Sequence, residues 1–109
     1  GKPYASFTSL VNHEGRFYCA FREAKKHYDP SGEDVGVVKI LYSKDGKRWQ
    51  SFLTYSVDGI DLRDPKLTVT PEGKIMLLVE EVKYEKKVAV LRKTCVSSLL
   101  INCIQSYYL

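Results

Sequence analysis

The sequence predicts an all-β chain of antiparallel, four-stranded meander sheets, arranged as consecutive blades of a partial β-propeller. Short β-branched and aromatic runs alternate with turns rich in Gly, Pro and Asp, and no segment keeps a helical period. One hairpin unit also recurs along the chain. Because such a unit cannot bury both faces of its sheet alone, we expect neighbouring sheets to pack together.

The first expected blade covers residues 1–60 and contains four strands in meander order. These strands are expected at residues 5–12, 17–21, 35–43 and 49–56. Glu14-Gly15 and Asp45-Gly46 are hairpin signals, because Gly and Asp suit tight turns between strands. The polar segment 25–34 contains Pro and Gly and is therefore expected to be a loop.

The second expected blade covers residues 61–109 and repeats the first. Its strands are expected at residues 66–70, 74–82 and 88–92. The repeat becomes visible when residues 10–17 are aligned with residues 68–75, because both segments place a Glu-Gly turn between two strands. From about residue 95 the sequence becomes atypical, with no charge, Gly or Pro. This segment is either a native last strand or a truncated or altered end.

Composition argues against several classes of ligand. The net charge of +4 is spread among acidic residues and no aromatic-basic motif accompanies it, so we expect no nucleic-acid partner. No apolar run is long enough to cross a bilayer, so no membrane partner is expected. Cys19, Cys95 and Cys103 form no CxxC pair, and His13 and His27 lack ligand spacing. We therefore expect neither a metal nor a cofactor.

The most specific motif is the turn that precedes the fourth strand. Ser43 and Asp45 can accept hydrogen bonds from the backbone of their own turn, and Gly46 can adopt the positive φ that it needs. Trp49 follows at the start of the next strand and is expected to fold back as an apolar plug. The motif has a structural role and carries no chemistry.

This stretch resembles the Asp-box, or BNR, repeat of sialidases, in which the usual pattern is S-x-D-x-G-x-x-W. Here one residue fewer separates Asp45 from Gly46. Residues 19–24 and 61–67 are similar to two further family segments, so the resemblance covers about residues 5–92. It implies a sialidase-like β-propeller glycoside hydrolase that binds carbohydrate and is secreted or periplasmic.

The resemblance also implies candidate site residues. The family places an acid/base catalyst in the loop after the first hairpin, where Asp29, Glu33 and Asp34 stand. A solvated loop is the alternative interpretation. Arg22, Arg63 and Asp64 are candidates for substrate binding, because guanidinium groups bind carboxylates or sugar hydroxyls and a carboxylate accepts from hydroxyls. The alternative for these three is a set of ion pairs, Arg63–Asp64 or Arg22–Glu23.

The chain departs from the family in one important respect. No arginine stands near residues 4–7, where sialidases carry the first arginine that grips the sialic acid carboxylate. In the family, the other arginines of this triad and the nucleophile come from later blades. We therefore expect this chain alone to lack the nucleophile and the full triad, and to show no turnover.

Three hypotheses remain open at the level of sequence. The chain is part of a sialidase-like glycoside hydrolase that contributes part of a carbohydrate pocket, or it is a non-catalytic carbohydrate-binding or structural β-repeat module. The third hypothesis is a self-assembling β unit in which several copies rebuild a propeller. Because open strand edges and apolar faces favour association, we expect self-association or pairing with the remaining blades of a parent chain.

Overall fold

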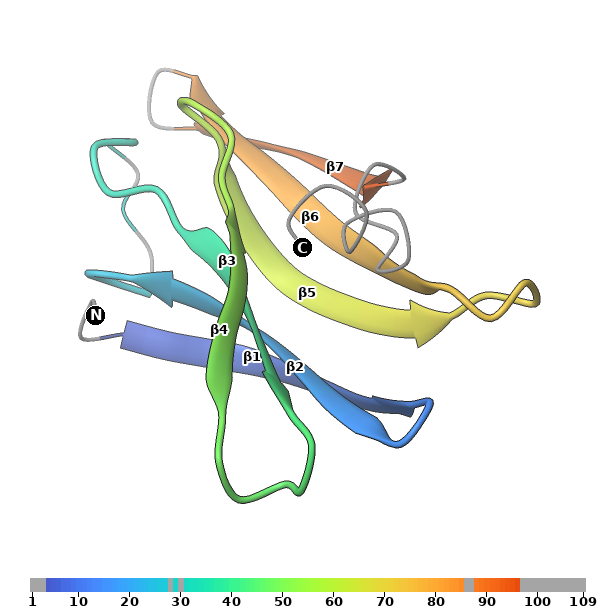
Figure 1. Cartoon of the computed structure of the whole chain (residues 1–109). Helices are drawn as coiled ribbons and strands as arrows, with labels where there is room; N and C mark the ends of the chain where they lie inside the picture. The colour runs from blue at the N-terminus through green and yellow to red at the C-terminus, as the bar shows by residue number, and fades with distance from the viewer. Residues whose placement is uncertain (1–3, 28, 30, 86–87, 97–109) are drawn as a thin grey trace.

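The computed structural model describes residues 4–27, 29, 31–85 and 88–96, and all its regular elements are β-strands (Figure 1). The strands are β1 (Tyr4–His13), β2 (Arg16–Ala24), β3 (Val37–Ser43), β4 (Gln50–Tyr55), β5 (Asp61–Val69), β6 (Ile75–Glu85) and β7 (Val88–Val96). Within the described residues, no helix has the length and apolar character that a membrane crossing requires. The atypical segment at the C-terminus lies outside the described residues from residue 97 onward.

The strands form two antiparallel sheets in meander order. The first sheet has the order β1-β2-β3-β4 and the second has the order β5-β6-β7. The hairpin turns between β1 and β2 and between β5 and β6 both use a glycine with positive φ, Gly15 and Gly73. The all-β class and the antiparallel meander order predicted from the sequence are therefore confirmed.

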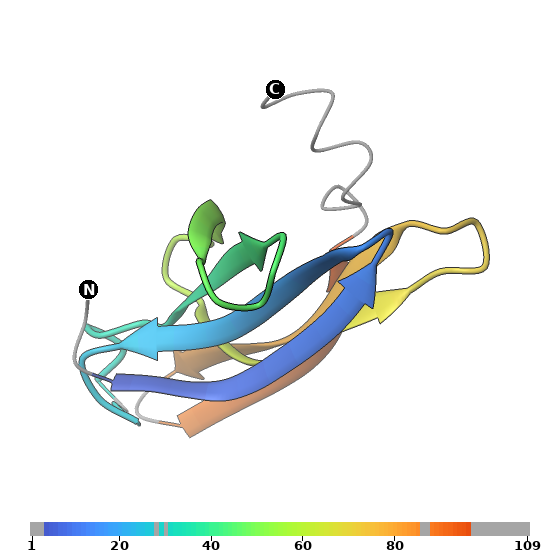
Figure 2. The ribbon, with the colours of Figure 1, turned by 60° about the horizontal axis from the view of Figure 1, so that its bottom comes forward.

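The two sheets pack against each other through β5, which contacts β1, β2 and β3 (Figure 2). One continuous apolar core lies between them and draws on both sheets. Its buried members are Tyr18, Ala20, Val38, Ile40, Leu62, Leu67, Ile75, Leu77 and Val79. A hydrogen bond also joins the sheets, because the backbone N–H of Leu67 donates to Ser9 Oγ at 2.9 Å. The first strands of the two sheets, β1 and β5, are thus held together.

Several strands begin or end differently from the sequence prediction: β6 and β7 run on to Glu85 and Val96, and β2 and β5 gain charged residues. β2 continues to Ala24 beyond the predicted end at Phe21, and β5 begins at Asp61 although the prediction placed its start at Lys66. The extra residues of β5 include an irregularity in pairing after Arg63, where Asp64 has a positive φ of 46°. Of the charged side chains in these stretches, Arg22 and Asp61 are buried against each other, whereas Asp64 is exposed.

Candidate functional site at the start of β5

The carboxylate of Asp61 lies at the centre of a buried polar network that joins both sheets. Arg22 donates to Asp61 Oδ1 through Nη2 at 2.7 Å and through Nε at 3.2 Å. The backbone N–H of Gly36 donates to the same oxygen at 2.7 Å. Asp61 Oδ2 accepts from Arg63 Nη1 at 3.1 Å and from the Tyr84 hydroxyl at 3.0 Å. Both oxygens of this buried carboxylate are therefore hydrogen-bonded.

The strands place these side chains by simple alternation. Asp61 and Arg63 are two residues apart on β5, so their side chains leave the same face of the strand. Asp61 pairs with Val82 on β6, and Tyr84 lies two residues further on that same face. The second sheet thus supplies three members of the network, and Arg22 and Gly36 enter from the first sheet and the segment before β3.

The guanidinium of Arg22 is fully buried, and its donors are directed into the protein. Besides its two bonds to Asp61, it donates through Nη1 to the backbone carbonyl of Lys26 at 3.2 Å. The ion-pair partner of Arg22 is thus Asp61, whereas Glu23 approaches Lys39 at 3.7 Å. Arg22 can therefore position other groups but cannot itself reach a ligand in this conformation.

Gly36 is required by the close approach of the chain to this ion pair. A Cβ atom at this position would lie 2.4 Å from Arg22 Nε and 2.7 Å from Asp61 Oδ1. The carbonyl of Gly36 also accepts a hydrogen bond from the backbone N–H of Leu62 at 3.1 Å. Residue 36 therefore links the two sheets through its backbone alone.

Arg63 lies at the outer end of the network. Its Nη1 donates to the carbonyl of His27 at 2.7 Å as well as to Asp61, and its Nη2 lies 3.4 Å from His27 Nε2. The hydroxyl of Tyr4 lies 2.9 Å from His27 Nδ1. The side chain of Arg63 is 13% exposed, so this guanidinium lies at the boundary between the network and solvent.

Asp64 does not join the network. It is exposed on the irregular segment of β5, and its Oδ1 lies 3.3 Å from Lys66 Nζ. The Arg63–Asp64 ion pair considered from the sequence is replaced by Arg63–Asp61, because Asp61 lies two residues from Arg63 on the same face of β5, whereas Asp64 stands at the irregularity and pairs with Lys66. The structure therefore brings Arg22 and Arg63 together around Asp61 and leaves Asp64 on the surface.

The acidic loop residues organise their own loop. Asp34 accepts from the backbone N–H groups of Lys25 and Lys26 at 3.2 and 2.8 Å. Asp29 accepts from the Ser31 hydroxyl at 2.6 Å and from the backbone N–H groups of Ser31 and Asp34. The Ser31 hydroxyl, followed by the Asp34 N–H, lowers the pKa of Asp29 below its ordinary value. This favours an ionised carboxylate, which suits an acceptor or base better than a proton donor.

The turn between β3 and β4 is held by its own side chains. Asp45 Oδ1 accepts from the backbone N–H groups of residues 47–48 at 2.8 and 2.9 Å, and Ser43 Oγ accepts from the Gly46 N–H at 2.8 Å. Gly46 has a φ of 77°. These backbone bonds lower the pKa of Asp45. Trp49 is 39% exposed, so it is not the buried plug that the sequence predicted.

Sequence reasoning did not select Asp61, Gly36 or Tyr84 as members of a site. A signal for Asp61 was present, because it stands two residues before Arg63 and alternation places both on one face. Gly36 and Tyr84 carried no such signal, since their contacts depend on how the two sheets pack. Within the described part of the chain, no group of three His, Cys, Asp or Glu side chains is placed to hold a metal ion.

Comparison with known proteins identifies solved structures of similar fold. No protein-family model matches the sequence, and no curated protein matches it. One similar solved structure comes from work on the GH130 family of mannoside phosphorylases, described as containing glycoside hydrolases that target β-1,2-mannosidic linkages in Candida mannan. It has a TM-score of 0.56 and 17% identity, over 87% of this chain and 29% of that chain.

Two further solved structures are similar. A proposed glycosidase from Bacteroides thetaiotaomicron has a TM-score of 0.57 and 16% identity, over 89% of this chain and 30% of that chain. A proposed glycoside hydrolase from Parabacteroides distasonis has a TM-score of 0.55 and 13% identity, over 84% and 29%. The chain thus spans less than a third of each of these structures. It has the fold of part of a glycoside hydrolase-type β-propeller.

Proposed function

We propose that this chain forms part of the carbohydrate-binding pocket of a sialidase-like glycoside hydrolase, with Arg63 as the residue that contacts the sugar. The observation that carries the proposal is the position of Arg63, whose guanidinium is held by the buried Asp61 carboxylate and lies at the boundary with solvent. The glycoside hydrolase-type fold of the chain supports the same class of function.

The chemistry of Arg63 fits an acidic sugar. A guanidinium is planar and always charged, and its fork of N–H donors matches the two oxygens of a carboxylate. Holding this group in one orientation before the ligand arrives lowers the entropy cost of binding. His27 and Tyr4, which lie beside Arg63, add polar groups that suit sugar hydroxyls.

Other residues take supporting roles in this proposal. Arg22 and Asp61 are positioning residues, because both are buried and their bonds fix the orientation of Arg63. Asp64 lies outside the Arg63 network, exposed on the irregular segment of β5, and it stays a candidate for accepting hydrogen bonds from sugar hydroxyls at the surface. Asp29 and Asp34 stay candidates for the acid/base role. Glycoside hydrolysis needs a second carboxylate or an equivalent nucleophile opposite the acid, so we expect no turnover of a fluorogenic sialoside by this chain alone.

The test compares an acidic oligosaccharide with its neutral core. Saturation-transfer NMR and calorimetric titration would measure binding of 3′-sialyllactose and of lactose to the whole chain. We expect sialyllactose to bind more tightly than lactose, and Arg63→Ala to weaken sialyllactose binding by about tenfold or more. Arg63→Lys keeps the charge but loses the fork, so its affinity should lie between those of the wild type and Arg63→Ala.

Arg92→Ala is the matched control, because Arg92 is an exposed arginine on β7 that pairs with Glu81 on β6 at 2.9 Å. It should leave sialyllactose binding unchanged. Equal binding by the wild type and Arg63→Ala would contradict the assignment of Arg63. A wild-type chain that binds neither sugar would contradict the carbohydrate role.

A purely structural β-repeat module is the second candidate, and one observation favours it. Arg22 and Asp61 are both completely buried, and their hydrogen bonds connect the two sheets. A buried ion pair of this kind can have a purely structural role, which is to fix how two elements pack. Loss of stability in Asp61→Asn, combined with no glycan binding by the wild type, would support this alternative.

A further inference from the structure

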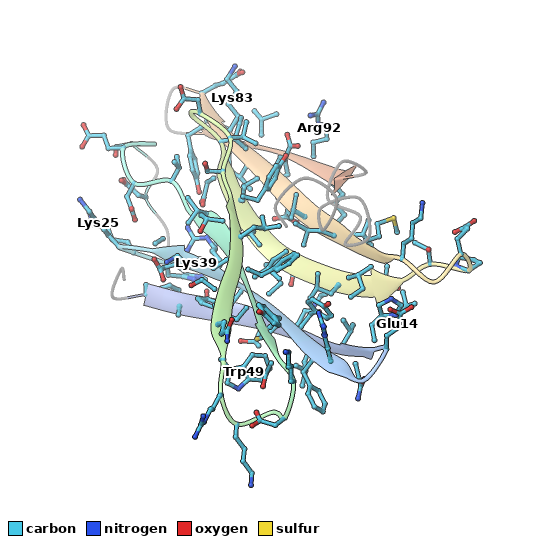
Figure 3. All side chains as sticks on the ribbon, viewed as in Figure 1. Glu14, Lys25, Lys39, Trp49, Lys83 and Arg92 are labelled. Carbon is cyan, nitrogen blue, oxygen red and sulfur yellow. The ribbon has the colours of Figure 1, made fainter. Side chains whose placement is uncertain are left out.

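The hairpin between β3 and β4 carries a groove at the opposite end of β3 from Gly36 and the Asp61 network. Its volume is about 160 Å³. Both strand ends and the turn contribute to the lining, which consists of Tyr42, Ser43, Lys44, Asp45, Arg48 and Gln50. Figure 3 shows Trp49 on the same hairpin, and Lys25 and Lys83 at the far end of the molecule. The groove is thus separate from the proposed pocket at β5.

This hairpin presents cations whose charge is not balanced locally. Lys44, Lys47 and Arg48 are exposed, and none of them forms an ion pair within the described residues. Asp45 is the one carboxylate in the turn, and its Oδ1 accepts the backbone N–H groups of Lys47 and Arg48. The hairpin therefore offers positive charge to an outside ligand.

The groove also offers a neutral donor, and an exposed aromatic residue adjoins its lining in the sequence. The Tyr42 hydroxyl donates to Gln50 Oε1 at 2.7 Å, which leaves the NH₂ group of Gln50 as the donor end of the amide. Trp49 is not part of the lining, but it stands between two residues that are, Arg48 and Gln50, and it is 39% exposed. A partly exposed aromatic ring can pack against the apolar face of a sugar, because the aromatic ring is itself apolar and one side of it is accessible from solvent.

We infer that this groove is a second glycan-contact site, and that it takes an acidic polysaccharide bearing sulfate or carboxylate groups. Sulfate and carboxylate oxygens accept from Lys44, Arg48 and the Gln50 amide, and the sugar ring packs on Trp49. The hydrogen bonds of Ser43 and Asp45 hold the turn in place before the ligand arrives, which lowers the entropy cost of binding. The inference does not depend on Arg63.

Trp49 makes the test direct, because it is the single tryptophan in the chain. Its fluorescence would be followed while the whole chain is titrated with dextran sulfate, with polygalacturonate, with neutral dextran and with inorganic polyphosphate. We expect one or both acidic glycans to change the Trp49 emission, with an affinity about tenfold or more above that of neutral dextran. Which acidic glycan binds more tightly identifies the preferred acidic group.

Polyphosphate separates a glycan site from a surface that only attracts charge. It should bind weakly through charge and should leave the Trp49 emission unchanged, because it has no ring to pack on the indole. An equal emission change and an equal affinity with polyphosphate would overturn the proposal. So would the absence of any response to both acidic glycans.

Two double variants of equal charge locate the site. Lys44→Gln with Arg48→Gln should weaken binding of the acidic glycan by about tenfold. Lys25→Gln with Lys83→Gln removes the same charge from the far end of the molecule (Figure 3) and should change the affinity less than about twofold. Circular dichroism would check that both variants fold. Equal weakening by both pairs would overturn the assignment to this hairpin.

Discussion

At the scale of single residues, Asp61 shows how a chain can bury a carboxylate. Removing a charge from water is costly, and the cost is offset only when partners and hydrogen bonds replace the lost water. Asp61 has two guanidinium groups, one backbone N–H and one hydroxyl as partners. The complete set of partners therefore stabilises the buried carboxylate, and the stability of the fold should fall when any one partner is removed.

Substitution of Gly36 tests how tightly this set is packed. In Gly36→Ala the added methyl group would lie 2.4 Å from Arg22 Nε, so either the arginine or the chain must move. We expect a loss of about 1–3 kcal/mol in the free energy of unfolding, measured by urea denaturation. Most of this loss should disappear when Gly36→Ala is introduced into an Arg22→Met background. A loss of the same size in both backgrounds would contradict the crowding argument.

Tyr84 gives the network a pH dependence. Burial, followed by the hydrogen bond and charge of Asp61, raises the pKa of Tyr84 from 10.0 to about 12. The unfolded chain releases this proton at lower pH than the folded chain does. The stability that this group contributes is therefore complete below pH 10.0 and is lost as the pH rises toward about 12.

The matching variant is Tyr84→Phe, which removes the hydroxyl and keeps the ring. At neutral pH we expect it to lower the free energy of unfolding by about 1.5–3 kcal/mol, because a hydrogen bond to a charged group is lost. Urea denaturation at several pH values should show this difference shrinking above pH 10.0, where the tyrosine contribution fades. A difference that stays constant to pH 12 would contradict the shifted pKa.

At the scale of elements, β5 shows what the sequence could and could not predict. The sequence prediction grouped Arg63 with Asp64, although alternation along a strand places Asp61 on the face of Arg63. It also started the strand only at Lys66, after the charged residues and Asp64-Pro65. The stretch is a strand because Asp61 is paired with Arg22, which lies 39 residues away along the chain. Such a distant partner leaves no local signal.

The turn at Asp45 is the opposite case, because all of its hydrogen bonds are local. Ser43, Asp45 and Gly46 predict the turn, and the structure has the expected contacts between these residues and their own backbone. The prediction for Trp49 was less accurate. The ring remains 39% exposed, since burial of an aromatic side chain depends on neighbours that the motif does not specify.

The Asp45 turn should also make the stability of the fold depend on pH, in this case in the acidic range. The backbone N–H groups of Arg48 and Lys47 lower the pKa of Asp45 below its ordinary value of 3.8. Its contribution to stability is therefore complete above pH 3.8 and is lost as the pH falls through the folded-state pKa. The free-energy difference between the wild type and Asp45→Asn should narrow below pH 3.8 in thermal melts. Asn keeps an acceptor oxygen without the charge, so a difference that does not narrow would show that the ionised form is not favoured.

At the scale of the whole molecule, the chain is two sheets joined through β5, which contacts β1, β2 and β3. The repeat in the sequence predicted two related units that need a neighbouring sheet, and a shared apolar core lies between the two sheets. How the units sit against each other was not predictable, since that depends on contacts such as Leu67 to Ser9 and Asp61 to Arg22. These contacts link residues that are distant in sequence and can be recognised only in three dimensions.

The outer strands lead to a prediction about association. β4 and β7 end their sheets in the described residues, and Val88 and Leu91 on β7 are 63% and 59% exposed. Apolar side chains beside a strand edge favour pairing with another chain. We expect multi-angle light scattering to show species larger than the monomer of 12.5 kDa, and Val88→Lys with Leu91→Lys to reduce them. A wild-type chain that remains monomeric at high concentration would contradict this expectation.

The central claim is that the Arg22–Asp61 ion pair holds the two sheets together and thereby fixes Arg63. A double-mutant cycle with Arg22→Met and Asp61→Asn, measured by urea denaturation, tests this claim most directly. Asp61→Asn leaves the buried Arg22 guanidinium without an anionic partner, and Arg22→Met leaves the Asp61 carboxylate with Arg63 as its remaining cation. Each single variant should cost about 3–5 kcal/mol, with Arg22→Met at the lower end. The double variant should lose less free energy of unfolding than the sum of the two single losses, by about 2 kcal/mol or more. Losses that add to within about 0.5 kcal/mol would show that the two residues act independently, which would contradict the account.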